Sequence, residues 1–478
     1  MPTRDYTFLG TTRSLCPECR RVLDAKIISK NNRVYFRKNC PEHGQIDDYV
    51  WSDVKDFDRH EYDQPAREAL KYGVAPDKGC PHDCGLCTEH EQHTCVALVE
   101  ITSGCNLKCP LCFAESGPGG THISFESFTG MVDRLVELEG IADVLQISGG
   151  EPTLHPDLVR MVDYACDQPI QAVMINTNGI RLAKDRALLS ELAKYKDRLE
   201  IYLQFDGFDP ATHIALRGED LVAIKQQAIA NFAEFGLRCT LVCTVAHDVN
   251  IQEVGAVLAF GVKTKAVRGL SFQLASYCGR HTQPVDLEQR ITLPDLVNAL
   301  ATQTNLLNKD DFLPLPCAHA NCHRIAYLYR ANDEVVPINR LIDVTKHLDL
   351  IANSIVYTPA RAKLIVAKAM EALGQCECGP AGCGPSAEPE TDFYAKAMAE
   401  QLNGEDVFRI TLTSFLDVHT FDTRQLMKCC LAHVLPSGHV VPFCSYNTLY
   451  RDGHLPLPPL VDRPAVAAPR VRLPVVAS

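Results

Sequence analysis

The chain has 478 residues, is 46% hydrophobic, and is acidic, with 47 Lys and Arg against 59 Asp and Glu. It can therefore bury a large core, and we expect no broad binding to nucleic acid. Its 22 cysteines fall in short groups, which favour metal ligation in a reducing compartment over disulfides. An apolar signal core and a long apolar run are both missing from the sequence, so we expect a cytoplasmic protein without a membrane span.

Residues 1–60 are predicted to form a small metal-binding module. Its candidate ligands come in two pairs, Cys16 with Cys19 and Cys40 with His43. The segment 22–36 between the pairs alternates in polarity around two asparagines, which predicts a β-hairpin. Three thiols and one imidazole suit tetrahedral zinc, and a rubredoxin-like iron is the alternative. The module is similar to a zinc ribbon or a rubredoxin.

Residues 61–95 carry a second cysteine group after a polar connection. Its members are Cys80, Cys84, Cys87 and Cys95. Four thiols at this spacing are enough for an auxiliary [4Fe–4S] cluster, with zinc as the alternative. Because the group directly precedes an apolar strand, a cluster there would lie near the active site.

Residues 96–310 alternate between apolar runs and helical periodicity. The periodicity predicts helices over 124–139, with Ser124 as N-cap, and over 184–196. Strands are expected at 96–102, 143–147, 171–176, 199–205, 238–245 and 268–274. Alternating strands and helices predict an α/β fold with a parallel sheet, whose functional side chains lie at the carboxyl ends of the strands.

Two segments at strand ends carry the chemistry. The loop after the first strand holds Cys105, Cys109 and Cys112. Three thiolates are one ligand short of a complete [4Fe–4S] set, so one iron would be open to a small molecule, whereas a structural zinc loop normally closes with a fourth ligand. One βα unit later comes the segment 149–152, Gly-Gly-Glu-Pro. Its glycines allow close approach to a ligand, and its carboxylate can accept from an ammonium.

Together these segments resemble the radical SAM (S-adenosylmethionine) enzymes. The resemblance implies a partial (β/α)6 TIM-like barrel and a SAM-coupled [4Fe–4S] cluster. It implies that SAM is cleaved reductively to a 5′-deoxyadenosyl radical, which abstracts hydrogen from an unactivated carbon, with electrons from a donor such as flavodoxin or ferredoxin. The residues implied in binding the cluster and SAM are Cys105, Cys109, Cys112, Gly149, Gly150, Glu151, Pro152, Asn176, Asn178 and Asp206.

The later polar residues of this set have a simpler explanation as well. Asn176, Asn178 and Asp206 would face the ribose or carboxylate of SAM, but Asn and Asp also favour turns without any ligand. Gln273, Ser276 and Tyr277 end the last strand and are candidates to face the substrate. The position before the third cluster cysteine is usually aromatic in this superfamily, and here it is Leu111, with Phe113 following. Cys166, Cys239 and Cys243 fall inside apolar helix or strand patterns and are therefore expected to be small core residues.

Residues 311–450 form a C-terminal cysteine-rich region, which we expect to cap the barrel and to hold an auxiliary cluster. A mixture of free thiols and a zinc site is the alternative. Its expected ligands are Cys317, Cys322, Cys429, Cys430 and Cys444. We expect no metal in the Gly/Pro-rich loop 374–390, which holds Cys376, Cys378 and Cys383. The Pro/Ala-rich tail 451–478 is expected to be extended and poorly ordered.

The ribbon, the group at Cys80–Cys95 and the segment 442–447, Pro-Phe-Cys-Ser-Tyr-Asn, together resemble the family of tetraether lipid synthases, whose members are also described as dihydro-hydroxymethylpterin methyltransferases. This implies one or two auxiliary [4Fe–4S] clusters and one mononuclear iron or zinc. We expect carbon–carbon bond formation on lipid chains in a long apolar channel, with peripheral contact to a membrane. The alternatives are radical methylation of a pterin or another small heterocycle, and a non-catalytic iron–sulfur or zinc protein.

Overall fold

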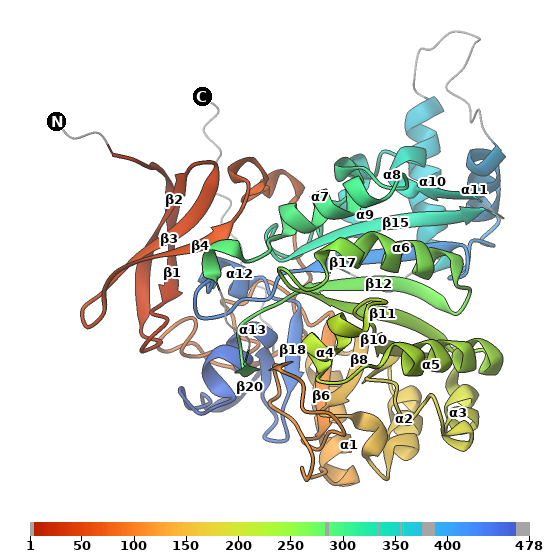
Figure 1. The fold of residues 1–478 in the computed structure, drawn as a ribbon, viewed down its shortest axis with the longest axis horizontal. Helices are drawn as coiled ribbons and strands as arrows, with labels where there is room; N and C mark the ends of the chain where they lie inside the picture. The colour runs from red at the N-terminus through yellow and green to blue at the C-terminus, as the bar shows by residue number, and fades with distance from the viewer. Residues whose placement is uncertain are drawn as a thin grey trace.

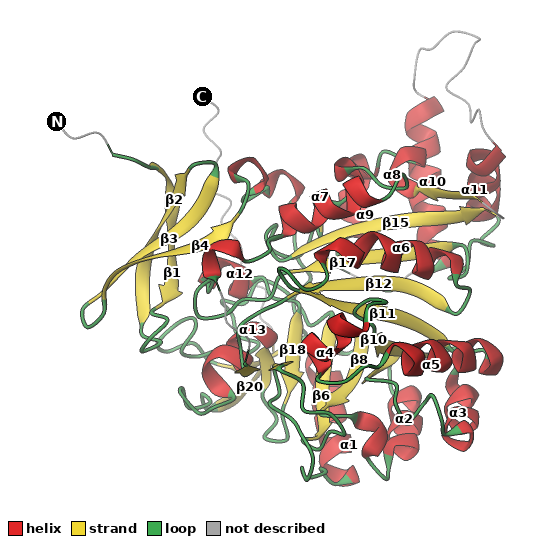
Figure 2. Ribbon diagram, viewed as in Figure 1, coloured by secondary structure: helices red, strands yellow, loops and turns green. Residues whose placement is uncertain are grey.

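The computed structural model describes residues 4–464 apart from 283–285, 332–333, 354–355, 357 and 375–387. A 12-stranded mixed sheet forms the curved centre of the molecule in Figure 1, with helices along its outer face. A separate four-stranded sheet at the N-terminus lies beside one edge of this layer (Figure 2). The loop cysteines Cys376, Cys378 and Cys383 lie outside the described residues.

The six predicted strands are confirmed and run parallel to one another. They are β6 (Val96–Thr102), β8 (Ala142–Gly149), β9 (Ile170–Thr177), β10 (Leu199–Gln204), β11 (Arg238–Val245) and β12 (Val267–Leu274). β8 is buried at every residue before its terminal glycine, as expected for a parallel strand covered on both faces. Their carboxyl ends therefore meet at one edge of the sheet.

The predicted helices are also present. The Ser124 side chain caps the helix that follows it by accepting from the Ser127 backbone N–H at 3.1 Å. The helix stripe of Phe128, Met131 and Leu135 is buried in the main core, because helical spacing keeps these residues on one face. The helices of this part are α1 (Phe125–Glu139), α2 (Leu158–Asp167), α3 (Arg186–Leu192), α4 (Pro210–Arg217), α5 (Val222–Phe235), α6 (Val254–Lys263) and α7 (Leu293–Gln303).

The C-terminal region adds strands to both sides of the same sheet. β17 (Val407–Thr413) pairs in parallel with β12, and β15 (His323–Ala331) follows it in antiparallel. On the other side β18 (Leu431–Val434) pairs in parallel with β6 and continues into β19 (Val440–Pro442). The shorter elements are β14 (Leu313–Pro314), β16 (Glu334–Pro337), α8 (Ile338–Leu341), α9 (Leu348–Ile351), α10 (Pro359–Gly374), α11 (Glu388–Met398), α12 (Thr423–Met427), α13 (Phe443–Ser445) and η9 (Tyr446–Tyr450).

The N-terminal module is an antiparallel sheet of β1 (Thr7–Leu15), β2 (Val22–Lys30), β3 (Arg33–Cys40) and β4 (Gly44–Trp51). Its central hairpin confirms the turn predicted at the two asparagines. In the tail, Leu460–Pro464 is extended as expected but is also ordered, because it forms β20 and pairs with β5 (Lys71–Val74); residues 465–478 lie outside the described residues. None of the described helices is both long and apolar enough to cross a membrane.

Candidate functional site

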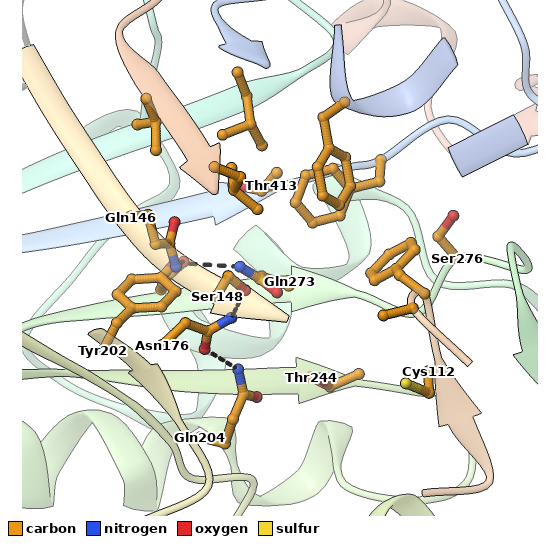
Figure 3. A pocket seen from close by; sticks show the side chains of 18 of the residues that line it. Cys112, Gln146, Ser148, Asn176, Tyr202, Gln204, Thr244, Gln273, Ser276 and Thr413 are labelled. Atoms are coloured by element: carbon orange, nitrogen blue, oxygen red, sulfur yellow. Dashed lines mark hydrogen bonds between the residues drawn. The ribbon is translucent and has the colours of Figure 1, made fainter. Parts of the chain in front are cut away.

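A cavity of about 300 Å³ lies where the parallel strands end. Its wall includes the thiol loop, Cys105, Cys109 and Cys112, and the backbone of Gly149 and Gly150. Figure 3 shows side chains from several strands pointing into it, with Cys112 at one side. The three predicted cluster cysteines therefore share one cavity with the polar strand ends.

The thiol loop is fixed to the rest of the protein by backbone contacts. Cys112 belongs to β7 (Leu111–Cys112), which pairs with β13 (Arg280–His281), and Arg280 Nε donates to the Cys109 carbonyl at 2.7 Å. Burial, together with the charges of Glu151, Cys109 and Cys112, raises the pKa of Cys105 to about 11. A bound cation would reverse this, because a coordinated thiol is deprotonated.

The two glycines at the end of β8, Gly149 and Gly150, are required by the packing of the thiol loop. The Gly150 N–H donates to the Thr102 carbonyl at 2.7 Å. A Cβ atom on Gly149, whose φ is +127°, would lie 2.2 Å from the Thr102 carbonyl oxygen, and one on Gly150 would lie 2.2 Å from that of Gly104. The Gly-Gly pair thus holds the end of β8 against the base of the loop.

Glu151 lies behind the cavity wall. It is 1% exposed, and its carboxylate accepts from the Thr177 hydroxyl and from the Asn178 N–H, each at 2.7 Å. Pro152 starts a single helical turn for which Glu151 is the N-cap. The resemblance implies that Glu151 helps to bind SAM, and in this structure its carboxylate joins the ends of two strands.

The predicted polar residues divide into two sets. Asn176 and Asn178 line the cavity; Asn176 donates to Ser148 at 3.2 Å and Asn178 donates to Asn106 at 2.6 Å. Asp206 is fully buried, and both of its carboxylate oxygens accept from Arg217 at 2.6 Å. Asp206 therefore orients Arg217, and the guanidinium is the group at the cavity wall.

Arg217, the last residue of α4, was missed by sequence reasoning. It lies beside the Cys109 thiol, where its charge lowers the pKa that burial raises. It also donates to Gln204 at 2.9 Å and Thr244 at 3.0 Å. A buried Asp at a strand end requires a cationic partner, and this requirement was the available signal.

The strands also present an amide and hydroxyl network to the cavity (Figure 3). Gln204 donates to Asn176 at 3.0 Å, Tyr202 donates to Ser271 at 2.7 Å, and Gln273 donates to Tyr202 at 3.2 Å. Gln273 and Ser276 line this cavity, whereas Tyr277 lines two neighbouring hollows. The wall made by the parallel strands is thus polar and already hydrogen-bonded.

The remaining cysteines are gathered differently from the sequence groups. The thiol of Cys95 contacts those of Cys317 and Cys430, which raise its pKa. The thiol of Cys84, whose pKa burial raises, lies near those of Cys80, Cys87 and Cys429. Cys429 in turn contacts Cys444, and Cys322 lies near Cys429 and Cys430. Cys95 therefore joins the C-terminal thiols instead of the three cysteines that precede it in sequence.

The N-terminal module brings its four predicted ligands together. The ligand atoms of Cys16, Cys19, Cys40 and His43 all lie within 4.8 Å of one another. His43 Nδ1 is 3.5 Å from Cys16 Sγ and 3.4 Å from Cys40 Sγ, and Cys19 and Cys40 Sγ are 3.8 Å apart. A tetrahedral zinc with bonds of about 2.3 Å to sulfur and about 2.1 Å to nitrogen separates its ligands by roughly 3.6–3.8 Å.

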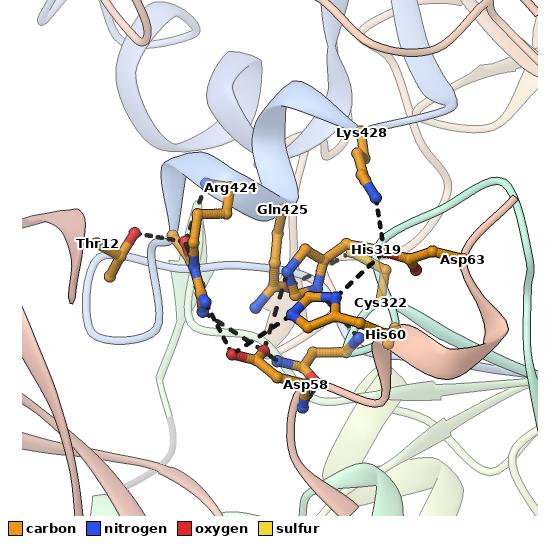
Figure 4. A network of polar contacts seen from close by, with 12 residues as sticks. Thr12, Asp58, His60, Asp63, His319, Cys322, Arg424, Gln425 and Lys428 are labelled. Atoms are coloured by element: carbon orange, nitrogen blue, oxygen red, sulfur yellow. Dashed lines mark hydrogen bonds and ion pairs between the residues drawn. The ribbon is translucent and has the colours of Figure 1, made fainter. Parts of the chain in front are cut away.

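A second group with metal-like spacing, Asp58, His60 and His319, has other partners (Figure 4). Asp58 accepts from Arg424 at 2.7 Å. His319 Nδ1 accepts from the Asn321 N–H at 3.2 Å, so its proton is on Nε2, the nitrogen that faces Asp58. This arrangement is an ion-pair network that joins the N-terminal module to α12, and it leaves no lone pair on Nε2 for a metal.

Comparisons with known proteins give separate matches for the parallel-strand region and for the N-terminal module. Residues 99–261 match the family model "Radical SAM superfamily", and residues 8–52 match "HMPTM N-terminal zinc ribbon domain". The chain belongs to the radical SAM superfamily, and it is a radical SAM enzyme. Within that superfamily it is 30% identical to the 7,8-dihydro-6-hydroxymethylpterin dimethyltransferase of Methanocaldococcus jannaschii, over 92% of this chain and 94% of that protein.

Other similarities are confined to part of the chain. Mycofactocin maturase MftC of Mycobacterium ulcerans is 30% identical over 32% of this chain and 41% of its own length. Among solved structures, Streptococcus suis SuiB bound to its precursor peptide SuiA matches with a TM-score of 0.37 and 19% identity, over 44% of this chain and 45% of that one.

Proposed function

We propose that this enzyme methylates a pterin or a closely related small heterocycle by radical SAM chemistry. The observation that carries the proposal is the cavity of about 300 Å³, in which, besides apolar side chains such as Phe113, Phe415 and Phe443, three thiols share the wall with a row of side-chain amides and hydroxyls. A heterocycle with several polar ring atoms needs such fixed partners, because leaving those atoms unpaired is costly. The similarity along the whole chain to a protein named as a pterin dimethyltransferase supports the same substrate class.

The cofactors would be held by residues at the strand ends, where the sheet forms the partial barrel. Cys105, Cys109 and Cys112 would bind the [4Fe–4S] cluster. The Gly149–Gly150 backbone, Asn176, Asn178 and Arg217 would orient SAM, with Glu151, Pro152 and Asp206 fixing the loops behind them. When bound, the cluster and SAM supply the radical chemistry of the superfamily. An external one-electron donor such as flavodoxin or ferredoxin is required.

We also propose two auxiliary [4Fe–4S] clusters with regrouped ligands. One would use Cys80, Cys84, Cys87 and Cys429, and the other Cys95, Cys317, Cys430 and Cys322. Contact or charge coupling among the thiols supports each set, and Cys444 lies against the first. In the N-terminal module, Cys16, Cys19, Cys40 and His43 would hold one ion, with zinc favoured over iron by the His ligand.

Lipid coupling, the function we expected first, remains the second candidate only through the family resemblance. It requires a long apolar channel, whereas this cavity, although leucine and phenylalanine side chains line part of it, also carries Gln146, Gln204 and Gln273, which favour a more polar substrate. A heterocycle substrate also requires no contact with a membrane.

The test is product analysis with the reconstituted enzyme. Anaerobic protein is incubated with SAM, a low-potential reductant and 7,8-dihydro-6-hydroxymethylpterin, and in parallel with dispersed lipid. We expect 5′-deoxyadenosine and a pterin heavier by one or two methyl groups. A coupled lipid product with an unchanged pterin would overturn the substrate assignment but not the superfamily.

A further inference from the structure

One wall of the cavity carries an ion pair that the cofactors do not explain. Glu100 lies on β6, and Arg451 directly follows η9. In the sheet, β18 and β19 lie beyond β6 on one side. Arg451 Nη2 donates to Glu100 Oε1 at 2.6 Å, and Nη1 donates to Oε2 at 3.0 Å. Both side chains line the cavity that also contains the thiol loop.

The pair is held in position from behind. Arg451 Nε donates to Asn447 Oδ1 at 2.8 Å, and the Asn447 amide donates to His433 Nε2 at 3.3 Å. His433 Nδ1 then carries the ring proton and faces Glu100 Oε1 at 3.9 Å. The guanidinium also lies over the Tyr446 ring, 4.8 Å from its centroid. These contacts fix both charged groups before any ligand binds.

The charge states follow from the surroundings. Burial would raise the pKa of Glu100, but the hydrogen bonds and charge of Arg451 hold it below its usual value. Burial lowers the pKa of His433 to about 4. At neutral pH the wall therefore presents a carboxylate and a guanidinium beside a neutral imidazole.

The pair has capacity left for a ligand. The Glu100 side chain is 27% exposed and the Arg451 side chain is 18% exposed. Both residues line the cavity. A carboxylate offers about four lone-pair positions, and Arg451 uses two of them. A buried pair with unused capacity is costly unless further hydrogen bonds satisfy it, so a polar ligand is its natural complement.

We propose that Glu100 and Arg451 bind the amino-pyrimidinone edge of the substrate ring and select for it. This inference rests on the proposed function. That edge presents two neighbouring N–H donors, from the ring and the exocyclic amine, and one carbonyl acceptor. A lone pair of Glu100 that Arg451 leaves free can accept from the exocyclic amine, and a remaining Nη–H of Arg451 can donate to the carbonyl. Glu100 is thus a specificity-determining residue.

The test compares the binding of two stable probes to the anaerobic, cluster-loaded protein by fluorescence titration. Pterin carries the exocyclic amine, whereas lumazine has an oxygen in its place and is otherwise the same ring system. We expect the wild type to prefer the pterin by more than about tenfold, since a hydrogen bond to a charged group is lost with lumazine. In Glu100→Gln the preference should fall to within about threefold.

The matched control is Glu234→Gln, which breaks the exposed pair with Arg186 on the outer helices; it should keep the wild-type preference. Iron content checks that each variant is folded, and Glu100→Asp, which keeps the charge but withdraws the carboxylate, replaces Glu100→Gln with the same expected loss of preference if the latter loses iron. A Glu100→Gln variant that keeps the preference overturns the inference and leaves the pterin site standing. A wild type that binds neither probe overturns the proposed function instead.

Discussion

The ligand group of the N-terminal module and the thiols around the cavity are built on opposite plans. Cys16, Cys19, Cys40 and His43 come from two turns of one small sheet, and their ligand atoms already lie within 4.8 Å of one another. Around the cavity, Cys95 meets Cys317 and Cys430 from far along the chain. Sequence spacing therefore identifies a ligand set where one turn or loop builds the site, and it does not show which thiols a large sheet brings together from distant segments.

The largest effect is expected from the loss of one cluster cysteine, which should abolish SAM cleavage at the cavity. Cys109→Ala should lower 5′-deoxyadenosine formation to the level without protein, because two thiolates cannot hold the cluster that SAM must meet. The control is Cys166→Ala, which removes a buried thiol of α2 in the main core. Chromatography of 5′-deoxyadenosine checks both, and substantial product from Cys109→Ala would contradict the assignment of this loop.

The regrouping of Cys95 can be tested by additivity. If Cys87 and Cys95 serve different clusters, Cys87→Ala and Cys95→Ala should each remove about four irons per chain, and the double variant about eight. If the four cysteines of residues 80–95 share one cluster, the double variant should lose no more iron than either single one. Iron analysis of the purified proteins distinguishes the two outcomes, and Cys19→Ser in the N-terminal module should leave both cluster losses unaffected.

A smaller effect on SAM cleavage is expected when the carboxylate that orients Arg217 is removed. Asp206→Asn removes the charge that orients this guanidinium, and SAM cleavage should fall by about 10–100-fold with a raised KM for SAM, as for other residues behind a metal site. The matched variant is Asp47→Asn, whose exposed carboxylate pairs with Arg37 at 2.7 and 2.5 Å in the N-terminal module. Exposed pairs contribute little, so cleavage by Asp47→Asn should stay within about twofold. Equal effects would show that Asp206 has no particular role.

The sequence predicted the six central strands, the capped helix and the thiol loop, because each depends on local periodicity or spacing. It also predicted that the four candidate ligands of the N-terminal module would lie together. It did not predict that Glu151 would lie behind the wall or that Arg217 would replace Asp206 at the cavity, since both depend on which side chain of a buried pair faces inward. The pair of Glu100 and Arg451 was missed because these residues lie far apart in the sequence and only the fold brings them together.

The smallest expected effect concerns two buried lysines, one in each region. Lys38 in β3 is neutralised by Asp48 at 2.6 Å, whereas Lys225 in α5 donates to the Asn178 carbonyl, and burial with the nearby charge of Arg217 lowers its pKa to about 8. An unfolded lysine titrates near 10.4, so between about pH 8 and pH 10 the unfolded chain binds more protons and folding is favoured as the pH rises.

From pH 7 to pH 9 this linkage should increase the free energy of unfolding of the wild type by about 1 kcal/mol relative to Lys225→Met, which cannot titrate. The measurement is the difference in urea midpoint between the two proteins at each pH. Because Lys38 is paired with a carboxylate in the other region, the wild type and Lys225→Met share its contribution and it cancels in the comparison. Parallel pH profiles for the two proteins would mean that Lys225 stays protonated in the folded enzyme, and that the acidic groups behind the thiol loop neutralise it as Asp48 neutralises Lys38.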